Sequence, residues 1–68
     1  MTSAQLAQVL EVKETYLLSH YRKIKESKEK IGIHLYKRGR GKTADFGYQD
    51  WKTDTICWRY EDYVVSHS

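Results

Sequence analysis

The first ten residues carry the hydrophobic spacing of a helix with one buried face. Three apolar residues follow the i, i+3, i+4 rule: Leu6, Val9 and Leu10. Thr2 followed by Gln5 matches a capping box, because the hydroxyl and the amide can satisfy the first free backbone N–H groups. The pattern therefore predicts a helix that begins near Ser3 and ends near Leu10 or Glu11.

A second helical pattern is expected to run without a break from about Lys13 to Lys30. Its apolar stripe consists of Leu17, Tyr21, Ile24 and Ile31. Lys28 interrupts this stripe, so the last turn is expected to be exposed. Gly32 follows where a left-handed residue commonly ends a helix, which predicts the helix terminus.

After Gly32 the hydrophobic period changes from that of a helix to that of a strand. Residues 33–37 alternate between two faces, and two glycines then weaken any further pairing. The predicted elements are a strand over Ile33–Lys37, a basic loop over Arg38–Lys42, a return strand over Thr43–Gln49, a polar turn over Asp50–Asp54, a strand over Thr55–Tyr60 and a short helix over Glu61–Val65. The large groups available for the core are Tyr21, Phe46, Trp58 and Tyr63.

These elements predict one α+β domain over residues 1–68, with two N-terminal helices and a two- or three-stranded antiparallel sheet. The spacing of the two helices fits a helix-turn-helix. Counted from Ser3, the small residue at the fifth place is Ala7, and the apolar anchor of the second helix is Leu17. The remaining apolar positions of the motif are Leu6, Leu10 and Val12. One departure is Glu11, which stands where the turn commonly has glycine.

Three segments in order resemble the compact winged helix-turn-helix of MerR-type regulators and of phage or transposon excisionases. They are LAQVLEV at residues 6–12, LYKRGRGK at residues 35–42 and WRYEDYV at residues 58–64. The resemblance implies a DNA-binding protein of a mobile genetic element that acts in DNA recombination or transcription regulation, without catalysis. Two departures are the long second helix and the seventeen residues (38–54) that separate the two matching strands.

The positive charge is concentrated in the middle of the chain. Residues 22–42 hold nine basic and two acidic residues, a net charge of +7, whereas the rest holds three basic and seven acidic residues, a net charge of −4. A basic centre with acidic flanks is typical of a surface that faces phosphate groups. The sequence therefore favours double-stranded DNA as the partner.

Helical residues that would enter the major groove, and basic residues of the hairpin, are the candidate DNA contacts. These are Lys13, Thr15, Ser19, His20, Arg22, Lys23, Lys37, Arg38, Arg40 and Lys42. A domain this small buries little surface on DNA, so we expect a monomer in solution that assembles cooperatively on DNA or is recruited by a recombinase or polymerase.

An alternative function is a small accessory subunit of a replication or recombination enzyme. In that interpretation Tyr36, Tyr48 and Trp51 dock on a protein partner, and the basic loop assists binding of single-stranded nucleic acid. The order of the elements favours duplex DNA binding over this alternative.

The sequence offers no signal for an enzyme, a cofactor or a metal. The histidines His20, His34 and His67 belong to three different predicted elements, and Cys57 has no paired ligand spacing. We expect Cys57 to be a small buried residue on a strand. No signal peptide or apolar run that could enter a membrane is apparent, so the expected location is the cytoplasm.

Overall fold

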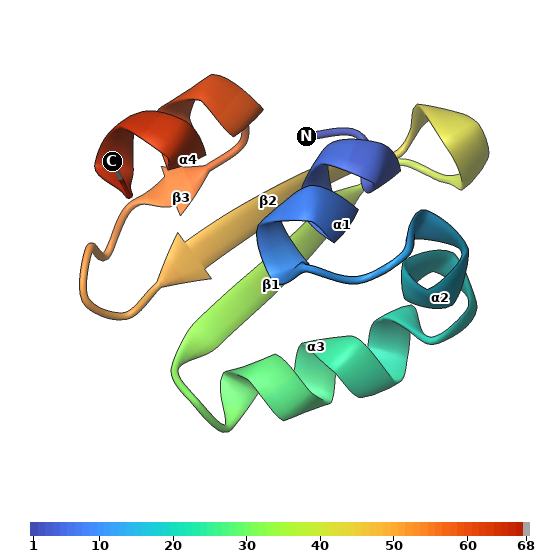
Figure 1. Cartoon of the computed structure of the whole chain (residues 1–68), viewed down its shortest axis with the longest axis horizontal. Helices are drawn as coiled ribbons and strands as arrows, with labels where there is room; N and C mark the ends of the chain where they lie inside the picture. The colour runs from blue at the N-terminus through green and yellow to red at the C-terminus, as the bar shows by residue number, and fades with distance from the viewer. Residues whose placement is uncertain (68) are drawn as a thin grey trace.

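A three-stranded antiparallel sheet in the order β1-β2-β3 forms one layer of this computed structural model, and the N-terminal helices cover one face of it (Figure 1). The structure describes residues 1–67, except for the side chain of Lys42. The elements are α1 (Ser3–Leu10), α2 (Glu14–Ser19), α3 (Tyr21–Glu29), β1 (Ile33–Arg38), the 3₁₀ turn η1 (Gly41–Thr43), β2 (Asp45–Asp50), β3 (Ile56–Cys57) and α4 (Tyr60–Ser66). The predicted α+β class is confirmed.

Helix α1 begins and ends where its sequence predicts. The Thr2 hydroxyl accepts from the backbone N–H of Gln5 at 3.2 Å, and the Gln5 side chain accepts from the backbone N–H of Thr2 at 3.0 Å, so the capping box is formed. Leu6 and Ala7 are buried on the inner side of the helix. The small Ala7 leaves room for a second helix to pack closely, as its position in the sequence pattern indicates.

The turn between α1 and α2 holds a residue in a conformation that favours glycine. Glu11 has φ 58° and ψ 43°, the left-handed region, where the Cβ of an L-residue crowds the following carbonyl. We expect Glu11→Gly to raise the free energy of unfolding by about 0.5–1 kcal/mol, because the relief of this strain exceeds the entropic cost of glycine. Thermal unfolding followed by circular dichroism measures the change. Glu11→Ala is the matched control, since it removes the charge but keeps the Cβ; equal stabilisation by alanine would contradict the strain argument.

The single helix predicted over residues 13–30 is wrong, because the chain bends at His20. His20 has φ −125° and ψ 27°, which ends α2 and begins α3 in a new direction. Helix α2 packs mainly against α1, whereas α3 packs mainly against β1. The bend lets the two short helices follow these two different neighbours. The predicted helix end is confirmed, since Gly32 has φ +85° and its amide donates to the carbonyl of Glu29.

The strands alternate as predicted, and the third strand is shorter than predicted. Leu35 of β1 is buried beside Phe46 and Tyr48 of β2, which share its face of the sheet. The strand expected over residues 55–60 pairs only at Ile56–Cys57. The return strand begins at Asp45 rather than at residue 43, because η1 occupies residues 41–43.

The first residue of the chain explains why β3 stops early. The α-ammonium group of Met1 donates to the carbonyl of Phe46 at 2.7 Å and also to the carbonyl of Trp58. The backbone N–H of Phe46 in turn donates to the carbonyl of Met1 at 2.8 Å. Met1 therefore occupies the edge of β2 at which a longer β3 would pair.

Aromatic side chains fill the space around the sheet. Tyr48 was expected to be exposed and is buried, at 5% exposure, and its ring makes a T-shaped contact with Tyr63 of α4, with ring centres 5.0 Å apart. Burial raises the pKa of Tyr48 to about 12, so its hydroxyl stays protonated at neutral pH. Phe46 is buried as predicted, and Tyr21 and Tyr63 are partly buried against the same core.

Candidate nucleic-acid interface

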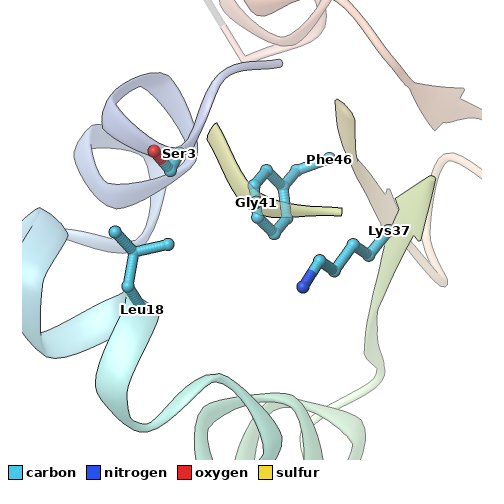
Figure 2. Close-up of a pocket in the computed structure, with 5 residues that line it drawn as sticks. All are labelled: Ser3, Leu18, Lys37, Gly41 and Phe46. Carbon is cyan, nitrogen blue, oxygen red and sulfur yellow. The ribbon is translucent and has the colours of Figure 1, made fainter. Parts of the chain in front are cut away.

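A hollow of about 280 Å³ separates α2 from the hairpin formed by β1 and β2. Its lining residues, drawn in Figure 2, are Ser3, Leu18, Lys37, Gly41 and Phe46. Leu18 points into this space from α2, and Lys37 points into it from β1 (Figure 2). The hairpin and the helix thus form two walls of one depression.

A second hollow of about 460 Å³ adjoins the first. It is lined by Leu18, Ser19, Tyr21, Arg22, Lys25 and Lys37. The two hollows share Leu18 and Lys37 as lining residues, and the pair is called here the basic groove. Its charged side chains come from two elements that are brought together only by the fold: Arg22 and Lys25 from α3, and Lys37 from β1.

None of the three cations of the basic groove forms an ion pair with a carboxylate of residues 1–67. Within residues 1–67, ion pairs join Met1 and Arg38 to Asp45, and Arg59 to Glu61, all outside the groove. The Lys37 ammonium lies 5.8 Å from the ring centre of Tyr21 and 5.9 Å from that of Phe46, so it makes cation–π contacts with both rings. The groove therefore presents three cations without an ion-pair partner among residues 1–67, an arrangement that suits an anion.

The polar side of α2 borders this surface. Thr15 and Ser19 are exposed on the side of α2 opposite the buried Leu17. Lys13 precedes α2 as its N-cap residue and is exposed. His20 stacks on Tyr16 with ring centres 4.7 Å apart, on the flank of α2 that faces away from the groove.

That other flank has a smaller hollow of its own. It is lined by Val12, Tyr16, Lys23, Ile24, Ser27 and Lys28. Lys23, a predicted DNA contact, therefore lies on the opposite side of α2 and α3 from Lys37.

The hairpin does not present its predicted basic residues together. Arg38 follows Lys37 on β1 and so points to the other face of the sheet, where its guanidinium lies 3.8 Å from the ring centre of Trp58 and bonds to Asp45 at 2.9 Å. Arg40 is exposed at the hairpin tip, where its carbonyl accepts from the Thr43 hydroxyl at 3.1 Å. Lys42 belongs to η1, and its side chain lies outside the described part of the structure.

The three aromatic residues expected at a protein interface are separated. Tyr48 is in the core, which removes it from any exposed surface. The Tyr36 hydroxyl donates to Gln49 Oε1 at 2.6 Å on the outer face of the sheet. Trp51 is 62% exposed and covers Gly32, where an added Cβ would come within 2.0 Å of the indole.

Comparison with known proteins gave no match to a protein-family model, to a curated protein or to a solved structure. The function must be argued from the chemistry of the groove itself. Its lining includes three cations, three hydroxyl groups and one exposed aliphatic side chain, which suits the binding of an anionic partner.

Other features of the described chain bear on the remaining expectations. Cys57 is buried on β3, as predicted. Among residues 1–67, no group of three or more His, Cys, Asp or Glu side chains is arranged to hold a metal ion. None of the helices in that part of the chain is long and apolar enough to cross a membrane.

Lys25 and Leu18 are two residues of the groove that were not among the predicted DNA contacts. Lys25 follows Arg22 by three residues and therefore lies on the same side of α3, a spacing that could have identified it. Leu18 stands beside the core residue Leu17 in an otherwise polar stretch, and its exposure depends on how α2 docks.

Proposed function

We propose that this chain is a winged helix-turn-helix protein that binds double-stranded DNA as an architectural factor or small regulator, without catalysing a reaction. The observation that carries the proposal is the basic groove. Arg22, Lys25 and Lys37 meet there from two elements and have no ion-pair partner among the described residues. Unpaired cations that converge on one depression next to an exposed helix are suited to the phosphates that flank a DNA groove.

In this proposal α2 is the recognition helix and the β1–β2 hairpin is the wing. The major groove is about 12 Å wide and admits one helix. Thr15 and Ser19 would face the base edges, and the cations of the basic groove would bind the sugar–phosphate backbone along that helix. Arg40, exposed at the hairpin tip, would reach phosphates further along the duplex.

The salt dependence of duplex binding tests the proposal. We expect Lys25→Gln and Lys37→Gln each to weaken binding to every duplex sequence and to lower the slope of log K against log salt concentration by about 0.9, the value for one lost phosphate contact. Fluorescence anisotropy with a labelled duplex at several salt concentrations gives both quantities.

Lys52→Gln is the matched control, because it removes one positive charge beside Trp51, outside the groove. An equal effect of Lys52→Gln would mean that only net charge matters, and the absence of duplex binding by the wild-type chain would overturn the proposal.

A second candidate is the accessory subunit of a replication or recombination enzyme. The 62% exposed Trp51 favours it, since a large aromatic side chain is a common anchor at protein interfaces. Tyr36 is the other exposed aromatic residue that this function would use. Binding to single-stranded but not to duplex DNA in the same anisotropy experiment would favour this second candidate.

A further inference from the structure

Leu18 is a large apolar side chain on the polar surface of α2. It is 54% exposed, whereas the adjacent Leu17 is fully buried and supplies the apolar anchor that α2 needs. The core therefore uses only part of Leu18. Leu18 also lines both hollows of the basic groove, so its exposed part lies among Arg22, Lys25 and Lys37.

An apolar side chain among cations constrains what can bind there. A wholly apolar ligand, such as a lipid chain, would have to take the cations out of water without neutralising them, which is unfavourable. A duplex offers anionic phosphates beside the base edges of the major groove, and the apolar group on those edges is the C5-methyl of thymine. This combination matches the composition of the basic groove.

We propose that Leu18 packs against the C5-methyl group of a thymine and so selects thymine at one position of the bound site. This inference rests on the proposed duplex binding and adds a specificity-determining residue to it. The hollow of about 280 Å³ into which Leu18 points has room for the methyl-bearing edge of a base. Lys37 on the opposite wall would hold the neighbouring phosphate.

Tyr16 is the other large exposed hydrophobic residue of α2, and its surroundings differ. Its ring is stacked on His20, and it lines the hollow on the other flank of the helix. Of these two side chains, only Leu18 lines the basic groove. A base whose backbone is bound in the groove would therefore reach Leu18 and not Tyr16.

Replacement of thymine by deoxyuridine tests the contact, because it removes the methyl group and leaves every hydrogen-bonding atom in place. The preferred duplex is first selected with the wild-type chain from a library of random sequence. Each thymine of that duplex is then replaced singly by deoxyuridine. We expect one replacement to weaken wild-type binding about fourfold, the equivalent of one buried methyl group.

The same replacement of thymine by deoxyuridine should not change duplex binding by Leu18→Ala or by Leu18→Gln. Glutamine is similar in length to leucine but lacks its apolar branch. Val64→Ala, which shortens an exposed apolar side chain on α4, should retain the full fourfold effect. Circular dichroism of each variant verifies that it is folded.

The outcomes separate this inference from the function on which it rests. If the wild-type chain binds no duplex, the proposed function fails and the inference fails with it. Duplex binding in which no thymine is selected, or in which the Leu18 variants keep the fourfold effect, would overturn the inference and leave the proposed function standing.

Discussion

Leu17→Ala is expected to lower the free energy of unfolding by about 3 kcal/mol, because it leaves a cavity in the packed core. Leu17 has 0% exposure and is the buried residue of α2. A chain of 68 residues has a total stability of only about 3–10 kcal/mol. The change should therefore lower the melting temperature by about 15 °C and leave a substantial unfolded population at 37 °C.

Leu18→Ala is the matched control, because it is the same substitution at the neighbouring, exposed position of α2. Leu18 is about half exposed, so its truncation should change the stability by less than about 0.5 kcal/mol. Thermal unfolding of the two variants measures the difference. Similar melting temperatures would contradict the described packing of α2.

Modification of the α-amino group is expected to cost about 2–4 kcal/mol of stability, since it leaves one buried and two partly buried acceptors with too few donors. The Met1 ammonium donates to the Asp45 carboxylate at 2.7 Å and to two backbone carbonyls, those of Phe46 and Trp58. An Nα-acetyl group, or a tag placed before Met1, leaves one N–H where the structure uses three and removes the positive charge. Chemical denaturation of chains that carry the same tag at either end measures the cost, with the C-terminal tag as the control.

The same contact makes stability depend on pH in the acid range. Hydrogen bonds from the Met1 ammonium and from Arg38 lower the pKa of Asp45 below its ordinary value of 3.8. A lowered pKa in the folded state contributes stability that is present above pH 3.8 and is lost as the pH falls through the folded-state pKa. The acetylated chain and Asp45→Asn should both lose part of this acid sensitivity. Unchanged acid unfolding in both would show that the contact is not formed in solution.

Local signals were sufficient for the elements that depend on neighbouring residues. The capping box of Thr2 and Gln5 set the start of α1, and Gly32 marked the end of α3. The alternation after Gly32 identified β1, and the paired glycines identified the hairpin loop. Each of these signals acts over a few residues, so the sequence alone carries them.

The features that sequence reasoning missed depend on distant contacts. The early end of β3 follows from Met1, which contacts a residue 45 positions away. The bend at His20 follows from the different partners of α2 and α3, and the burial of Tyr48 from the docking of α4. In the candidate site, Lys37 was predicted and lines the groove, whereas Arg38 faces away. Because successive residues of a strand point to opposite faces of the sheet, the sequence could have shown that Lys37 and Arg38 face different sides.

The shortness of α2 limits how much sequence information one copy of the chain can read. Six residues at about 1.5 Å each span about 9 Å, which is the length of about three base pairs. A given run of three base pairs recurs by chance about once in 64 positions of a random duplex, far too often to mark one place in a genome. On the proposed function, the remaining information must come from the spacing of several such runs. The number of copies that bind side by side, or the recombinase or polymerase that recruits them, would then determine which DNA site is bound.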